Sequence, residues 1–441
     1  MSKGGEQIVL FPEQHGRRVE LRLDTEAQTS DAGALLLAGA DRRLALTESL
    51  AGAIRDGRRG GQVRHETLGL LRQRIFGLAA GYADCNDVAR LAADPVWVQL
   101  KRTSGRDASA LASQPTLSRF ENGLTSRDLV ALGKVLRDRV IAAAQRRYGA
   151  RRVRRIVIDL DPTCDRAHGQ RQLIAFNAHD DSYCYLPLCA FLSFDGHPES
   201  HLVAAVLRSG SCRDFEGAVP LLRRLLPGLR RAFPKARLTV RVDGGFANEE
   251  IRDWLEDQPR TWYVANLPRN AALEGEAELF DLLLAARQEA FATGCSARRF
   301  GELTYAAKTW DTFRRVIVKG EVTLLEGREP KDNPRFLVTN LRGRPERLYA
   351  TYTERGDIEN RLKELKGSLA LDRTSCTRFL ANQARVLLAA SAYVLLQELR
   401  LAATGTACER AQVDTLRLRL LKIGARVVVS VRRLVLHGPQ A

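Results

Sequence analysis

The spacing of apolar residues predicts a helical first third of the chain. Between residues 31 and 150, apolar side chains recur at intervals of three and four, which is the spacing of an amphipathic helix. One such set comprises Leu68, Leu70, Leu71, Ile75 and Leu78. We therefore expect residues 1–150 to form a helical N-terminal region.

Within this region, the segment 112–123 carries the signals of a short helix. Ser113 suits the position just before a helix, and Pro115 suits its first turn. Such a helix would present Gln114 and Arg119, as the recognition helix of a helix-turn-helix does. An ordinary surface helix explains the same signals, so both interpretations stay open. In the first of them, Gln114 and Arg119 contact DNA.

From residue 154 the pattern changes to β-branched runs. Strands are predicted at 155–161, 183–194, 201–207, 237–243 and 261–266, and helices at about 213–232 and 247–256. The first strands follow one another as a meander, and the later ones alternate with helices. This order is typical of a mixed α/β sheet.

The remaining segments complete the predicted domain organisation. Residues 268–345 are rich in Arg and in short strand-like runs, which predicts a β-rich insertion. The flanking segments 151–267 and 346–375 would then form one catalytic core. Residues 376–441 hold a long apolar helix near 381–402 and a basic strand, and we expect a C-terminal helical and strand region with a possible role in dimerisation.

Charge and composition restrict the partners of the chain. Its 441 residues include 69 Lys and Arg against 52 Asp and Glu, a net charge of +17, which favours a polyanion. The eight cysteines form no CxxC pair, and no clustered His/Cys spacing predicts a zinc site. The most apolar late stretch, 386–397, is too short to span a bilayer. We expect a cytoplasmic protein with reduced thiols and no membrane partner.

Four residues near the C-terminal end share one side of a predicted helix. Tyr352, Arg355, Glu359 and Lys366 stand at offsets of 0, 3, 7 and 14, which project into an arc of about 60°. A carboxylate that holds a divalent metal, flanked by cations that hold phosphates, suits phosphoryl transfer on nucleic acid. A solvated charged helix face has the same sequence pattern. Partner carboxylates elsewhere in the chain would favour the metal-binding interpretation over it.

Two strand ends supply candidate partner carboxylates. Asp161 ends the strand 155–161, and Asp243 ends the strand 237–243. With Glu359, they could hold two metal ions that activate an attacking hydroxyl and stabilise a leaving oxygen. Cap or turn roles explain each aspartate alone. Asp159 lies on the same face of the strand as Asp161. Asp161 is the favoured metal ligand of the two, because it stands at the end of the strand.

The chain resembles bacterial insertion-sequence transposases of the DDE type, in the cut-and-paste group with a Tyr-x2-Arg-x3-Glu-x6-Lys helix. All four residues of that signature match at Tyr352, Arg355, Glu359 and Lys366. The first and second acidic motifs resemble 161–163 and 243–246, although Ser is more usual in the family than Gly at 244. Further similarity lies at 116–122, 183–188 and 333–340, so the resemblance covers nearly the whole chain.

This resemblance implies an RNase H-like core with a β insertion between the second aspartate and Glu359. It implies that Asp161, Asp243 and Glu359 hold two Mg²⁺ ions, with Mn²⁺ as a substitute, and that Tyr352, Arg355 and Lys366 grip terminal phosphates. The implied partners are terminal inverted repeats and target DNA, bound by a homodimer associated with the bacterial nucleoid. The implied reaction cleaves both strands through a hairpin and joins the 3′-OH ends to the target.

Two alternatives keep the same fold. One is a structure-selective nuclease that never joins ends, and the wide insertion and the basic N-terminal region argue against it. The other is a non-catalytic DNA-binding protein derived from a transposase, which the presence of all three acids disfavours.

Overall fold

The computed structural model describes the chain from residue 27 onward, with a few short gaps. The described residues are 27–58, 63–89, 91–101, 110–246, 248–430 and 433–438, together with the backbone of a hairpin formed by β1 (Glu13–Gln14) and β2 (Arg17–Arg18). Within them lie one large mixed sheet, two small sheets and a group of packed helices.

The large sheet has nine strands and forms the centre of the protein. Its strand order is β12-β13-β15-β11-β10-β4-β8-β9, with β14 paired to β13. The strands are β4 (Arg155–Pro162), β8 (Leu188–Phe194), β9 (His201–Val206), β10 (Arg237–Val242), β11 (Thr261–Leu267), β12 (Ala297–Tyr305), β13 (Arg314–Thr323), β14 (Lys331–Asp332) and β15 (Arg335–Thr339). β4, β10 and β11 run parallel, and the other pairs are antiparallel. The prediction of a mixed α/β sheet is confirmed.

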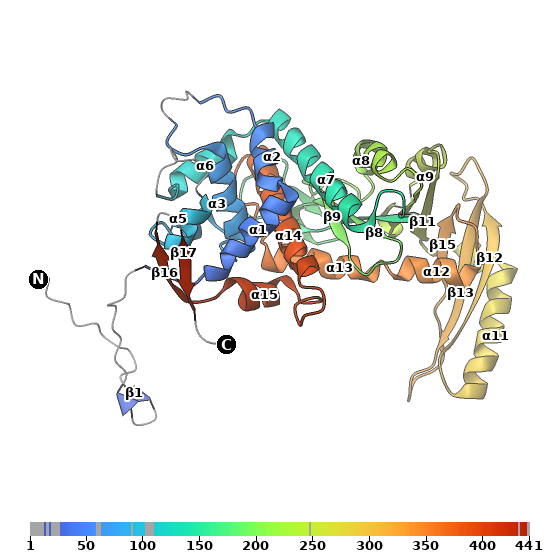
Figure 1. Cartoon of the computed structure of the whole chain (residues 1–441). Helices are drawn as coiled ribbons and strands as arrows, with labels where there is room; N and C mark the ends of the chain where they lie inside the picture. The colour runs from blue at the N-terminus through green and yellow to red at the C-terminus, as the bar shows by residue number, and fades with distance from the viewer. Residues whose placement is uncertain are drawn as a thin grey trace, which may run out of the picture.

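Helices lie beside the parallel strands and at both ends of the molecule. The N-terminal ones are η1 (Ala32–Ala34), α1 (Leu35–Leu44), α2 (Leu46–Ala53), α3 (Thr67–Ala79), α4 (Cys85–Ala89), α5 (Pro95–Lys101), α6 (Gln114–Gly123) and α7 (Ser126–Tyr148). The others are α8 (Ala218–Ala232), η3 (Gly244–Phe246), α9 (Glu249–Glu256), α10 (Ala271–Glu274), α11 (Ala277–Thr293), α12 (Pro345–Thr353), α13 (Gly356–Lys363), η4 (Glu364–Ser368), α14 (Phe379–Ala402), α15 (Val413–Leu416) and η5 (Arg417–Leu421). In Figure 1 the N-terminal helices gather around α14 at one end, and α11 lies against β12 and β13 at the other.

The long apolar helix α14 joins the N-terminal helices to the sheet. It contacts α1, α3 and α7 as well as β9. By length and composition it could cross a membrane, with a mean hydropathy of 1.4, but 78% of that window is buried inside the protein. Its apolar surface is therefore used for packing, and a single hydrophobic core extends from α1 through α14 to the sheet.

Two small sheets flank the large one. The first contains β5 (Asp165–Arg166), β7 (Ser182–Tyr185) and β6 (Ala175–Asn177). The second contains β17 (Leu434–His437), β16 (Ala425–Val429) and β3 (Gln28–Thr29). The predicted strand 183–194 is thus two strands, β7 and β8, in different sheets. Pro187 lies between them, and its lack of an N–H explains why one ladder does not continue through it.

The predicted single helix over 352–366 is interrupted. α12 ends at Thr353, α13 begins at Gly356, and a π-helical turn, η4, follows from Glu364. The N–H groups of Arg355 and Ile358 both bond to carbonyls three residues earlier instead of four. The four signature residues therefore do not share one regular stripe: Tyr352 lies on α12, Arg355 caps α13, Glu359 lies on α13 and Lys366 lies in η4.

Candidate active site

Strand pairing places two of the candidate acids at the same edge of the sheet. β4 and β10 are parallel neighbours, and Asp159 pairs in register with Arg241. Asp161 stands two residues further along β4, and Asp243 directly follows the end of β10. Because parallel strands end at the same edge, the topology brings these two side chains together.

Asp159 and Asp161 have different surroundings, although they share a face of β4. Asp159 is fully buried and forms two hydrogen bonds with Arg241, at 2.6 Å from Nε to Oδ1 and 2.9 Å from Nη2 to Oδ2. This bidentate pair joins β4 to β10 and satisfies the carboxylate. Asp161 instead reaches the end of the sheet, towards Asp243.

One guanidinium links the two acids at the sheet edge. Nη2 of Arg355 lies 3.0 Å from Oδ1 of Asp161 and 3.5 Å from Oδ2 of Asp243. The nitrogen Nε of Arg355 is buried and has no partner among the described residues. Arg355 therefore occupies the position of a counter-cation between two converging carboxylates.

Burial and neighbouring acids raise the pKa of Asp161 to about 7. Desolvation is the largest cause, and the charges of Asp243 and Glu359 act in the same direction, while Arg355 opposes them. Two carboxylates thus repel the charge of Asp161. Such mutual repulsion is what a bound divalent cation relieves.

Glu359, Tyr352 and Lys366 surround this pair of acids at different depths. The Glu359 side chain is exposed and lies close enough to Asp161 to raise its pKa. Burial raises the pKa of the half-buried Tyr352; the charge of Asp243 acts in the same direction, and that of Arg355 opposes it. Lys366 donates a hydrogen bond of 2.7 Å from Nζ to the backbone oxygen of Cys164, three residues after Asp161.

A fourth carboxylate near Asp243 was not predicted from the sequence. Asp214, in the loop before α8, lies against Gly245, where a Cβ would come within 1.9 Å of its Oδ2. Burial and the charge of Asp243 raise the pKa of Asp214. No motif surrounds Asp214, so its approach depends on the fold alone. Gly245 is the sequence signal that could have indicated a crowded backbone at this point.

The donor set suits a hard divalent cation. Asp161, Asp243 and Glu359 offer only carboxylate oxygens, the ligands that Mg²⁺ and Mn²⁺ prefer. Asp161 and Asp243 already converge on a shared cation, which is Arg355 here. These residues fit a metal-binding role.

A second ligand cluster has softer chemistry. Cys164, Asp180 and Cys184 place their ligand atoms within 4.8 Å of one another. The sequence spacing did not indicate this group, because the residues are 16 and 4 positions apart and meet only through the β5–β7 pairing. Thiolate ligands favour zinc over magnesium, so this cluster is chemically distinct from the carboxylates.

The predicted DNA-contacting residues lie on a separate surface. Arg119 is exposed on α6 and lines an open groove of about 900 Å³ between that helix and the loop around Arg58. Gln114, the first residue of α6, is half-buried. The opposite side of α6 is fixed by Glu121, which pairs with Arg74 at 2.6 Å and Arg385 at 3.0 Å. The structure does not bring Gln114 or Arg119 to the acids.

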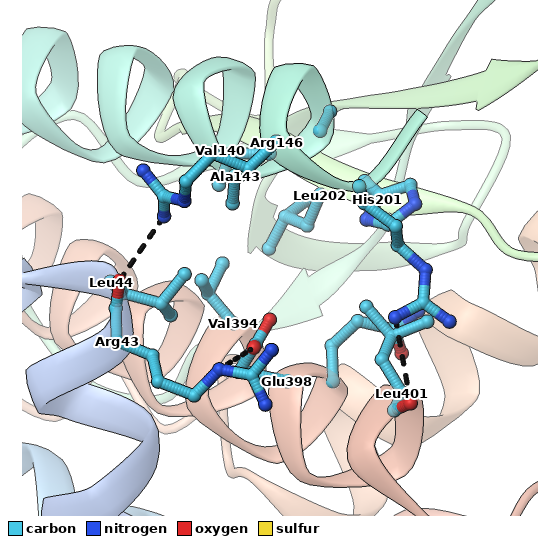
Figure 2. Close-up of a pocket in the computed structure, with 13 residues that line it drawn as sticks. Arg43, Leu44, Val140, Ala143, Arg146, His201, Leu202, Val394, Glu398 and Leu401 are labelled. Carbon is cyan, nitrogen blue, oxygen red and sulfur yellow. Dashed lines mark hydrogen bonds and ion pairs between the residues drawn. The ribbon is translucent and has the colours of Figure 1, made fainter. Parts of the chain in front are cut away.

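A further cavity, of about 530 Å³, lies between α1, α7, β9 and α14 (Figure 2). Its wall includes Leu44, Val140 and Val394, and the ion pair of Arg43 with Glu398 crosses its rim at 3.1 Å. None of the candidate site residues lines this cavity. It lies between packed elements and is separate from the candidate acids.

Comparison with known families places nearly the whole chain in one group. The family model described as transposase DDE domain group 1 matches residues 11–441. The comparison with curated proteins found no match.

Proposed function

The chain belongs to the transposase DDE domain family, group 1, and from this membership and the clustered acids we propose that it is a cut-and-paste DNA transposase. It would bind the terminal inverted repeats of an insertion sequence, cleave both strands by metal-dependent phosphoryl transfer through a hairpin, and join the 3′-OH ends to target DNA. The observation that carries the proposal is the convergence of Asp161 and Asp243 on Arg355, with Glu359 close by.

Asp161, Asp243 and Glu359 would hold two Mg²⁺ ions, and Mn²⁺ would substitute. When bound, the metal would lower the charge repulsion among the acids and polarise phosphate oxygens. Asp159 would act through its buried ion pair with Arg241. This pair holds β4 against β10 and so sets the position of Asp161.

Arg355 and Lys366 would hold DNA phosphates near the acids. Arg355 cannot ligate a metal, and its guanidinium has further donors besides the Nη2 that contacts the acids, which suits a phosphate oxygen. Lys366 donates a hydrogen bond to the backbone oxygen of Cys164, which holds it beside the segment that follows Asp161. Tyr352, half-buried beside Arg355, would support the same phosphate.

Recognition of the transposon end would use α6 in the helical N-terminal region. Arg119 and Gln114 would contact base edges, and the cations lining the same groove, Arg55, Arg58 and Arg64, would contact phosphates. The protein would act as a homodimer on the bacterial nucleoid, in the cytoplasm, because synapsis of two ends needs two active sites.

The test is a cleavage assay on a labelled duplex with the inverted repeat that borders the coding region. Wild-type protein with Mg²⁺ should give nicked, hairpin and joined products. Glu359→Gln should abolish all three and leave end binding within about twofold, whereas the exposed Glu346→Gln on α12 should behave as wild type. Full cleavage by Glu359→Gln refutes the assignment.

The same gel separates the alternatives. Nicking without joined products at any target concentration would indicate a nuclease. Sequence-specific binding without any Mg²⁺- or Mn²⁺-dependent cleavage would indicate a DNA-binding protein derived from a transposase.

A further inference from the structure

A row of cations crosses the large sheet at the edge opposite to the acids. Arg154, Arg155, Lys235, Arg237 and Arg342 line an open groove of about 900 Å³, together with Trp262 and a few polar and apolar residues. All five cationic side chains are exposed. The described lining of this groove contains no Asp or Glu.

The sheet topology explains how these residues meet. Arg155 and Arg237 are register partners at the starts of β4 and β10, and Trp262 lies near the start of β11. β15 runs antiparallel to β11, so the residues just after it, including Arg342, return to the same edge. Across four strands about 4.8 Å apart, the row spans about 14 Å. That length corresponds to about four steps of a DNA strand at 3.4 Å each.

The cations of this groove are not neutralised within the described part of the chain. None of the five forms an ion pair with a carboxylate there, whereas Arg241, further along β10, pairs with Asp159. The nearby Asp195 uses its carboxylate to accept from the backbone N–H groups of Arg154 and Arg155. Like charges directly opposite on paired strands destabilise a sheet, so the pair of Arg155 and Arg237 has a cost that an anionic ligand would remove.

Trp262 adds an apolar surface to the cationic row. Its indole is half-buried, and the guanidinium of Arg237 lies 5.6 Å from its ring centroid. This cation–π contact restrains Arg237, which is exposed at the groove. A planar arginine fork held in this way matches phosphate oxygens better than a mobile lysine does.

We propose that this groove binds the phosphodiester backbone of a second stretch of duplex DNA, separate from the phosphate at the acids. Along β4, Arg155 and Asp161 are six residues apart, which is about 20 Å, so one phosphate cannot contact both. That the second stretch is target or flanking DNA rests on the proposed function. The duplex-binding property itself rests only on the groove.

The test uses full-length protein with Arg155→Gln, Arg237→Gln and Arg342→Gln combined. Binding to an unrelated duplex of random sequence is measured by fluorescence anisotropy across a salt series. The variant should lose at least tenfold in affinity at moderate salt, and the slope of log K against log salt should fall by about 2 to 3 because three phosphate contacts are lost. The control is Arg223→Gln combined with Arg224→Gln, two exposed arginines on α8, whose slope should stay near wild type.

Two further probes distinguish the source of the DNA. One is the terminal-repeat duplex ending at the cleavage position, and the other is the same duplex extended into flanking sequence. A defect confined to the extended duplex assigns the groove to flanking DNA, and a defect with the random duplex assigns it to target DNA. If the variant matches the Arg223 and Arg224 control on every probe, the proposal is wrong. A wild-type protein that binds random duplex through the groove but never cleaves would instead refute the proposed function alone.

Discussion

Replacing His201 should remove a defined part of the dependence of stability on pH. His201 is a buried residue of β9 at the cavity in Figure 2, and Oη of Tyr148 lies 2.9 Å from its Nε2. Burial lowers its pKa from 6.5 to about 4, and the charge of Arg147 acts in the same direction. The folded state therefore disfavours the charged imidazole.

The sign and size follow from linkage. The folded-state pKa is below the unfolded one, so the contribution of His201 is fully present above pH 6.5 and is lost as pH falls towards 4. With these two pKa values, folding should lose about 2 kcal/mol between pH 7.5 and pH 5 through this residue alone. Asp161 and Asp165 have pKa values raised to about 7, so they act in the opposite direction, and by the same linkage their combined gain exceeds the loss from His201 in the wild type.

The assay is urea unfolding of the wild type and His201→Phe at pH 7.5 and pH 5. Phe retains the ring packing against Phe194 and cannot be protonated. Because the two acids are present in both proteins, the difference between the two pH dependences isolates His201. The variant should gain about 2 kcal/mol relative to the wild type on going to pH 5. Equal pH dependences in the two proteins would refute the reasoning.

Three further predictions concern the acids and the helix α6. Glu121→Ala leaves Arg74 and Arg385 without their shared carboxylate, and it should lower the free energy of unfolding in urea by about 3 to 5 kcal/mol. The exposed Glu48→Ala should lower it by less than about 1 kcal/mol. A cost below about 1 kcal/mol for Glu121→Ala would contradict the buried triad. Gly245→Ala would displace the Asp214 carboxylate from beside Asp243 and should lower Mg²⁺-dependent nicking about tenfold with the melting temperature nearly unchanged. Gly39→Ala, at an open position on α1, should nick normally. Unchanged nicking by Gly245→Ala argues against a role for Asp214. Arg355→Lys should lose nicking, hairpin and joining together, because a single ammonium in place of Nη2 cannot contact both acids and also donate to a phosphate oxygen, as a guanidinium with several donors can. Lys366→Ala should nick and lose mainly hairpin and joined products. Identical product patterns for the two variants would show that the residues act alike.

Features set by local pattern could be predicted from the sequence, and those set by strand order could not. Asp161 and Asp243 were found because each follows a β-branched run, and parallel pairing then places them together. The position of Arg355 between the acids depends on the break between α12 and α13. Gly356 is the one residue at this break that could have indicated it, because the segment contains no proline. Pro187 does indicate the break between β7 and β8, but the apolar residues on both sides of it favour one continuous strand.

The remaining surprises come from residues distant in sequence. Asp214 reaches Asp243 only through the packing of its loop against Gly245. The cationic groove joins the starts of three strands to the end of a fourth, so it requires the sheet order β15-β11-β10-β4. A hydrophobic pattern predicts that strands exist, but it does not state which strands are neighbours.

The central claim is that Asp161, Asp243 and Glu359 together hold the catalytic metal. Anomalous diffraction from crystals of the full-length protein bound to its terminal-repeat duplex, grown with Mn²⁺, tests it most directly. We predict two manganese peaks beside these three carboxylates, and their disappearance in Asp161→Asn crystals. Peaks confined to Cys164, Asp180 and Cys184, or none within bonding distance of Asp161 and Asp243, would contradict the account.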